Sequence, residues 1–162
     1  ALSKVVAGQD FKMTKAPSFS LQSDTNQTIS LKDLAGKKVL LFFFPKAGTP
    51  GCTTQACGFR DHFTELTDHN ATVVGISPDS PAQLAEWKKQ AKLPFMLLSD
   101  PDHRVAEAYG AWGERSMFGY KYQGIIRSHF VIDEHANLIQ EERKIGPKDS
   151  VKKGLKAILK SS

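Results

Sequence analysis

Apolar and polar positions along the chain follow the periods of strands and helices in turn. A continuous apolar run at residues 39–44 has the pattern of a strand that is buried on both faces of a largely parallel sheet. Four further short apolar segments are expected to form strands, at residues 72–76, 95–98, 126–132 and 138–141. A turn at residues 133–137 joins the last two, which predicts an antiparallel edge.

Helical periodicity occurs between and after these strands. Ser80, Pro81 and Gln83 combine an N-cap, a proline at the first helical position and a capping-box glutamine. A short helix is expected at residues 102–109. Apolar stripes at helical spacing indicate three helices. The helix that begins near Cys52 has its stripe at Cys52, Ala56, Phe59 and Phe63, the helix that follows Ser80 at Leu84, Trp87 and Ala91, and the closing helix at Val151, Leu155, Ile158 and Leu159.

Strands that alternate with helices predict an α/β fold, with a central mixed β-sheet and helices on both faces. Residues 19–21 and 28–31 flank a polar turn at residues 23–27, which predicts an N-terminal β-hairpin. No internal repeat, low-complexity tract or linker interrupts the sequence. We therefore expect one domain over residues 1–162.

Composition is that of a globular protein, with 40% apolar and 24% charged residues. The apolar run at residues 39–44 is far shorter than the roughly 20 residues of a membrane helix, so no membrane span is expected. Residues 1–10 have no apolar core of a secretion signal. A cytoplasmic location is expected, although a leader removed before residue 1 stays open because the chain begins with alanine.

The net charge of +5 raises the question of a polyanionic partner. Basic pairs such as Lys37-Lys38 and Lys152-Lys153 are short and scattered, and no nucleic-acid-binding motif accompanies them. We interpret them as solvated surface and expect no nucleic acid partner.

Two cysteines, Cys52 and Cys57, are too few for a disulfide framework and are candidates for thiol chemistry. A nucleophilic cysteine reacts as the thiolate, which is a minor form of a free thiol at neutral pH. Cys52 lies at the expected start of a helix, where unpaired N–H groups and the positive end of the dipole favour an anion. The alternative is that Cys52 is only a small buried apolar residue.

The loop before Cys52 contains residues that suit a hydroperoxide site. Thr49 offers a hydroxyl that can hydrogen-bond both the thiolate and the incoming peroxide, while Pro45 and Gly51 restrict the path of the loop. We expect Pro45, Thr49 and Gly51 to contact substrate. On the alternative interpretation, Thr49 is only a turn residue.

Cys57 is the expected partner of an oxidised Cys52, because a sulfenic acid condenses with a nearby thiol to a disulfide. Residues five apart on an intact helix have Cα atoms roughly 8 to 9 Å apart. A disulfide tolerates at most about 7 Å. The first part of the helix is therefore predicted to unwind when the disulfide forms.

Arg127 lies in the predicted strand at residues 126–132, where a buried anion such as the Cys52 thiolate would explain an arginine. An arginine that faces water at a strand edge is an equally good interpretation of the pattern alone.

The histidines His103, His129 and His135 have no partner that spacing identifies, so solvated or hydrogen-bonded surface positions are expected.

Two other functions compete with a peroxidase. A metal site would use Cys52, Cys57, His62 and His69, but the two sulfurs diverge on a helix by roughly 140°, and zinc ligands usually come in closer pairs. A dithiol exchange protein that acts on other proteins usually has a C-x-x-C motif, which the chain lacks.

Residues 42–61, FFFPKAGTPGCTTQACGFRD, closely resemble the active-site segment of peroxiredoxins of the bacterioferritin-comigratory or peroxiredoxin Q group. The pattern P-x-x-x-T-x-x-C falls on Pro45, Thr49 and Cys52. The resolving cysteine of the group falls on Cys57, and the strand arginine falls on Arg127. The resemblance extends from about residue 16 to the end of the chain.

This resemblance implies a thioredoxin-like fold and reduction of hydrogen peroxide and organic hydroperoxides without a metal or organic cofactor. It also implies a Cys52–Cys57 disulfide in each turnover, reduction by thioredoxin or a similar dithiol protein, and a monomer. Gln55 stands where the family usually has glutamate, and Phe44 where it often has tyrosine. An amide forms no ion pair with Arg127 but can accept its hydrogen bond, so we expect activity with a changed rate.

Overall fold

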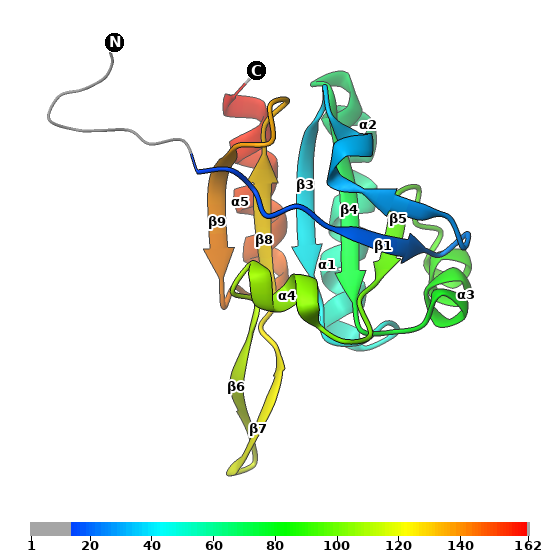
Figure 1. Cartoon of the computed structure of the whole chain (residues 1–162), viewed down its shortest axis with the longest axis vertical. Helices are drawn as coiled ribbons and strands as arrows, with labels where there is room; N and C mark the ends of the chain where they lie inside the picture. Colours follow the sequence, from blue (N-terminus) through cyan, green and yellow to red (C-terminus); the bar gives the residue numbers. More distant parts are fainter. Residues whose placement is uncertain (1–13, 162) are drawn as a thin grey trace, which may run out of the picture.

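A seven-stranded mixed sheet organises residues 14–161, the part of the chain that the computed structural model describes (Figure 1). The strand order is β2-β1-β5-β4-β3-β8-β9. These strands are β1 (Ser20–Ser23), β2 (Thr28–Ser30), β3 (Lys38–Phe43), β4 (Ala71–Ser77), β5 (Met96–Ser99), β8 (Ser128–Ile132) and β9 (Leu138–Arg143). Residues 1–10, considered above for a secretion signal, lie outside the described residues.

Strand β3 is a fully buried inner strand of this sheet. It pairs in parallel with β4 and antiparallel with β8, and all six of its residues are buried. Successive side chains of a strand point to opposite faces, so a continuous apolar run is needed when both faces are covered. Leu40 and Phe42 enter one apolar cluster, whereas Leu41 and Phe43 enter the other. The predicted buried strand and the antiparallel edge formed by β8 and β9 are confirmed.

Helices cover both faces of the sheet, as expected. The face that carries Leu40 and Phe42 packs against α1 (Pro50–Asp61), α2 (Phe63–Asp68), α3 (Pro81–Ala91) and α5 (Pro147–Lys160). The opposite face packs against α4 (Arg104–Ala108) and the short 3-10 helix η1 (Leu31–Leu34) (Figure 1). Helix α3 begins with the predicted capping box, in which Ser80 Oγ accepts from the Gln83 N–H at 3.2 Å.

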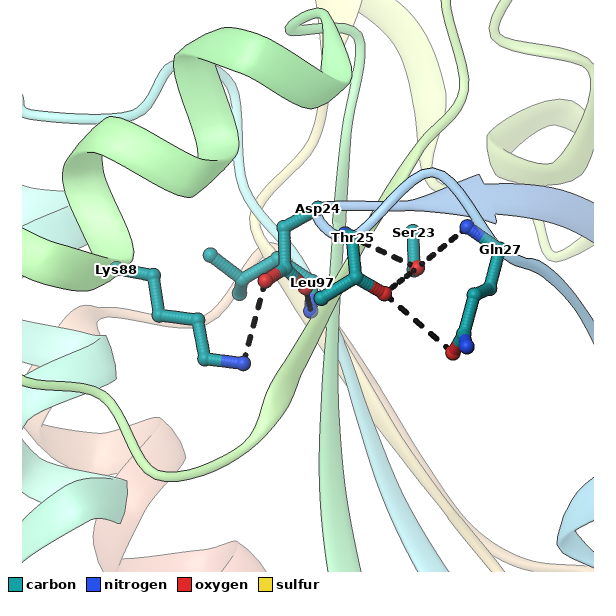
Figure 2. A network of polar contacts seen from close by, with 6 residues as sticks. All are labelled: Ser23, Asp24, Thr25, Gln27, Lys88 and Leu97. Carbon is teal, nitrogen blue, oxygen red and sulfur yellow. Dashed lines mark hydrogen bonds and ion pairs between the residues drawn. The ribbon is translucent and has the colours of Figure 1, made fainter.

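The predicted N-terminal hairpin is present as β1 and β2, and its turn is tied to the rest of the sheet (Figure 2). Asp24 lies in this turn with a side chain that is only 5% exposed. Its carboxylate accepts from the Leu97 N–H at 3.1 Å and contacts Lys88 Nζ at 3.2 Å. Because Leu97 is in β5 and Lys88 in α3, one buried carboxylate joins three elements.

Several predicted boundaries shift in the structure, and the shifts at α1, α2 and β8 lie closest to the two cysteines and Arg127. Helix α1 begins at Pro50, two residues before Cys52, and ends at Asp61. Phe63 therefore opens the separate helix α2 and packs its ring against Phe95. Strand β8 begins at Ser128, so Arg127 precedes the strand on which it was expected.

The sequence predicted no element for residues 110–125, which form the hairpin of β6 (Trp112–Met117) and β7 (Tyr120–Ile125). This hairpin extends away from the sheet (Figure 1). Its turn residues Phe118 and Gly119 both have positive φ, as a tight two-residue hairpin turn requires. Most of its side chains are exposed, including Phe118 at 96%. The alternation that marks a half-buried strand is therefore missing.

Candidate active site

Cys52 lies in the first turn of α1 and is fully buried. Thr49 is the N-cap residue, and the Thr53 N–H donates to its carbonyl at 2.9 Å. Cys52 is thus among the helical residues whose N–H groups have no partner inside the helix, at the positive end of the dipole. The fold therefore places the sulfur beside unpaired N–H groups at a helix start and away from water.

Arg127 is the charged side chain in contact with this sulfur. Its Nη1 and Nη2 atoms each lie 3.5 Å from Cys52 Sγ. The backbone on either side is held, because the Ile126 N–H donates to Ala111 at 2.8 Å and the Arg127 carbonyl accepts from Ile145 at 3.1 Å. The guanidinium is a planar cation that presents two of its N–H groups to the sulfur. Of the two positions considered for Arg127, the structure places it against the Cys52 sulfur and not at a strand edge that faces water.

Gly51 allows this close approach of the arginine. A Cβ atom at Gly51 would lie 2.9 Å from Arg127 Nη2 and 3.6 Å from Pro147 Cγ. The first distance is shorter than a van der Waals contact permits, so a larger residue would displace the guanidinium. In this structure Gly51 therefore acts by making room for Arg127.

Thr49 and Pro45 lie in the loop between β3 and α1. Thr49 Oγ1 donates to the Lys46 carbonyl at 2.8 Å, so its proton is committed and its lone pairs remain to accept from a peroxide O–H. The expected hydrogen bond from Thr49 to the thiolate is not formed in this arrangement. Half-buried Pro45 begins the loop. Asp79 holds the loop from outside, because its Oδ2 accepts from the Ala47 N–H at 2.7 Å.

Gln55 replaces the expected carboxylate and is fully buried. Its Oε1 accepts from Arg127 Nη1 at 2.9 Å, and its Nε2 donates to Ser150 Oγ at 2.9 Å. Ser150 Oγ is also 2.8 Å from Nδ1 of His129, whose Nε2 is 2.6 Å from Gln140 Oε1. The amide therefore orients Arg127 without an ion pair, as the hydrogen-bonding capacity of glutamine allows.

The expectation of a surface position for His129 is wrong. Its ring is buried between β8 and α5, and burial lowers its pKa. A histidine inside the apolar run at residues 126–132 was the available sequence signal, by the same argument that singled out Arg127. Ser150 and Gln140 lie in ordinary positions of a helix and an edge strand, and no local pattern distinguishes them.

Cys57 lies five residues beyond Cys52 in the same uninterrupted helix and is partly exposed. Both cysteines are free thiols. The metal site considered above is not assembled, because His62 contacts Glu65 and His69 Nδ1 contacts the Glu65 backbone oxygen instead. Within residues 14–161, no group of three or more His, Cys, Asp or Glu side chains is placed to bind a metal ion.

An open hollow of about 440 Å³ adjoins Arg127. Ile126, Ile145 and Pro147 give it apolar walls, and the charged side chains of Arg115, Lys144 and Glu114 also line it. It lies between the middle of β6 and the start of α5, beside the arginine that contacts the sulfur. The hollow has room for a substituent larger than a hydrogen atom.

A buried cysteine in the first turn of a helix, contacted by a fixed arginine on a thioredoxin-like α/β fold, defines a thiol-dependent peroxidase of the peroxiredoxin class. Enzymes of this class act on hydroperoxides with a thiol reductant. The AhpC/TSA family profile matches residues 13–141, and the chain belongs to this family.

Known peroxiredoxins resemble the chain over most of their length. The peroxiredoxin Bcp of Bacillus subtilis is 43% identical over 144 residues, which cover 89% of this chain and 92% of that protein. The structure of BcpB from Mycobacterium tuberculosis superposes with a TM-score of 0.82 at 30% identity, over 93% of this chain and 97% of that one. For the bacterioferritin comigratory protein of Xanthomonas campestris, the TM-score is 0.83 at 26% identity, over 88% and 91%.

None of the helices within residues 14–161 combines the length and the hydrophobicity that a bilayer-spanning segment needs.

Proposed function

We propose that Cys52 is the sulfur that attacks the hydroperoxide and that Arg127 stabilises it as a thiolate. The observation that carries this proposal is the contact of two guanidinium nitrogens with Sγ, each at 3.5 Å, at a buried helix start. The thiolate attacks one peroxide oxygen, the O–O bond breaks, and the leaving alkoxide or hydroxide takes a proton. Cys52 becomes a sulfenic acid, and an alcohol or water is released.

Cys57 is the proposed resolving cysteine. Its thiol condenses with the sulfenic acid, so a Cys52–Cys57 disulfide forms and water leaves. Both cysteines belong to the intact helix α1, in which residues five apart are roughly 8 to 9 Å apart between Cα atoms. Because a disulfide allows at most about 7 Å, α1 must unwind over this segment in each turnover.

Thr49, Pro45 and Gly51 form the proposed substrate site. Thr49 accepts from the peroxide O–H, since its own proton is donated to Lys46. Gly51 leaves space for Arg127, and Pro45 restricts the path of the loop. Hydrogen peroxide and organic hydroperoxides are the proposed substrates. The partly apolar hollow beside Arg127 offers room for an organic substituent, and the Xanthomonas campestris relative is described for alkyl peroxide reduction.

A dithiol protein such as thioredoxin is the proposed reductant, by exchange with the Cys52–Cys57 disulfide. All bond changes take place on sulfur and oxygen, so the mechanism requires no metal or organic cofactor. A single domain over residues 1–162, a monomeric state and a cytoplasmic location complete the proposal. A role in antioxidant defence follows from peroxide removal.

Stopped-flow mixing of the reduced protein with hydrogen peroxide tests the assignment of the two cysteines. The Cys52→Ser variant is expected to lose rapid oxidation. The Cys57→Ser variant is expected to oxidise once, to stop as a sulfenic acid that a dimedone-type reagent traps, and to fail in turnover with thioredoxin. Rapid oxidation that survives in Cys52→Ser would overturn the proposal.

A further inference from the structure

A buried chain of hydrogen bonds connects the active-site arginine with the edge of the sheet. It runs from Arg127 through Gln55, Ser150 and His129 to Gln140, at donor–acceptor distances of 2.9, 2.9, 2.8 and 2.6 Å. The three middle residues are fully buried. They belong to three elements, α1, α5 and β8. Buried polar side chains are costly unless their hydrogen bonds are satisfied, so each member constrains the next.

The direction of this chain is determined from its outer end. Gln140 presents its oxygen to His129 Nε2, so this nitrogen must carry the proton. Burial keeps the imidazole neutral, which leaves Nδ1 as an acceptor for the hydroxyl of Ser150. With its proton donated, Ser150 can only accept from Gln55 Nε2. The amide oxygen of Gln55 must then face Arg127.

We propose that His129 and Ser150 are positioning residues of the peroxidase site, which hold the Gln55 amide with its oxygen toward Arg127 and thereby aim the guanidinium at Cys52. The reversed amide would place an NH₂ group against the guanidinium, and Arg127 would lose its inner acceptor. This inference rests on the proposed role of Cys52 and adds to it the source of the arginine's orientation.

This chain of hydrogen bonds from Gln140 to Arg127, called the relay below, explains how glutamine can stand at position 55. A carboxylate there would accept from both Arg127 and Ser150, because it has no hydrogen to donate. The Ser150 hydroxyl would then turn toward position 55, and His129 Nδ1 would have to donate to it. A glutamate therefore requires a proton on Nδ1 of His129, whereas glutamine requires a bare Nδ1.

Protonation of His129 reverses the relay in the same way. The charged groups facing this ring are Glu142, its pairing partner on β9, and Lys153 on α5, which oppose each other and lie 3.6 Å apart. Arg127 reaches the ring only through Gln55 and Ser150, and the pairing partner on β3 is the apolar Phe42. An imidazolium would donate from Nδ1 to Ser150, whose own proton would then face Gln55 Nε2, so only Arg127 would still favour the present orientation of Gln55.

The first test is nitrogen NMR of the histidine rings in the reduced protein, which needs no turnover. At neutral pH, His129 is expected as the neutral ring with its proton on Nε2. In the Gln55→Glu variant it is expected to carry a proton on Nδ1. A wild-type ring protonated on Nδ1, or an unchanged ring in Gln55→Glu, would overturn the relay.

The second test is the rate of Cys52 oxidation by hydrogen peroxide. Ser150→Ala is expected to slow it roughly tenfold, and Ser150→Thr, which keeps the hydroxyl, should restore most of the rate. Gln140→Leu, at a partly exposed position of an edge strand, releases the outer end of the relay without a change in the core. His135→Gln, at an exposed turn outside the hydrogen-bond chain, is the control and should keep the wild-type rate.

Wild-type rates in both Ser150→Ala and Gln140→Leu would show that the relay does not position Arg127. If only the relay is wrong, rapid oxidation by hydrogen peroxide will still require Cys52. If Cys52→Ser itself oxidises rapidly, the proposed function fails whatever the tautomer of His129.

Discussion

Arg127 contacts the sulfur of Cys52 with both terminal guanidinium nitrogens, each at 3.5 Å, while its Nη1 also donates to Gln55 at 2.9 Å. The two residues are far apart in the chain and meet because the start of α1 faces the start of β8. The planar guanidinium thus contacts both the Cys52 sulfur and Gln55, the side chain that orients it. The geometry depends on a fork of donors and not on positive charge alone.

Arg127→Lys is therefore expected to slow oxidation of Cys52 about 100-fold, the size of effect seen when one preorganised donor is removed from a reaction centre. The ammonium keeps the charge but cannot contact Sγ through two nitrogens and also reach Gln55. Stopped-flow rate constants with hydrogen peroxide measure the effect, with far-ultraviolet circular dichroism as the check on folding. A rate within twofold of wild type would mean that charge alone suffices.

Gly51→Ala separates activity from stability. The new Cβ would lie 2.9 Å from Arg127 Nη2, the far end of a flexible side chain that can move aside. Alanine also favours the helical conformation over glycine by up to about 1 kcal/mol. We expect an unchanged or raised Tm together with oxidation slowed at least about tenfold, because a small misplacement of a catalytic group is costly. A loss of Tm without a loss of rate would contradict the spatial argument.

Asp79→Ala tests the support of the substrate loop. The Asp79 carboxylate accepts from the Ala47 N–H and from Ser77 Oγ, each at 2.7 Å, and both donors would lose their partner. The free energy of unfolding is expected to fall by about 1 to 2 kcal/mol, as for other partly buried donors left unpaired. Urea titration measures it, and Asp102→Asn on the exposed surface is the control. Equal stability of the two variants would exclude this role.

The central architecture of the protein could be predicted from the sequence because burial determines the pattern. β3 must be apolar at every position when both faces of the sheet are covered, and the capping box of α3 is a local feature. The hairpin of β6 and β7 escaped prediction because its strands pair with each other and bury little. Periodicity records burial, so an exposed hairpin leaves only its turn as a signal.

The active site likewise contains residues that the sequence could indicate and residues that it could not. Cys52 and Thr49 belong to one short segment whose chemistry can be read in order. Ser150 and His129 act through contacts between residues 95 and 21 positions apart, which no local spacing encodes. Arg127 was identified because a charge in an apolar run requires a partner. The same argument applies to His129, which lies in the same run.

Stability is expected to depend on pH through His129. Burial lowers its pKa from 6.5 in the folded protein, so below about pH 6.5 the unfolded chain binds a proton that the folded chain does not. The free energy of unfolding should therefore fall as pH falls from about 6.5 toward the lowered value, by at most about 1.4 kcal/mol per pH unit. The lowered pKa values of Asp33 and Asp133 act only below about 3.8. The free energy of unfolding, measured by urea titration at several pH values in this range, should depend less steeply on pH in His129→Gln than in wild type. In the control variant His135→Gln, the dependence on pH should match wild type. A slope that survives in His129→Gln would assign it to another group.

Formation of the disulfide should unfold part of α1 while α5 stays intact. Cys52 and Cys57 cannot be joined across an intact helix, and Gln55, which lies between them, must leave Arg127 and Ser150 as the segment unwinds. Hydrogen exchange of the oxidised protein is expected to show lost protection at residues 52–57. Protection of α5 (Pro147–Lys160) should remain, because Gly154 and Ile158 are buried. Cys57→Ser treated with the same peroxide is the control, since it is oxidised at Cys52 without the constraint of a disulfide. Equal protection of residues 52–57 in the reduced and disulfide forms would mean that the bond forms by another movement of the chain.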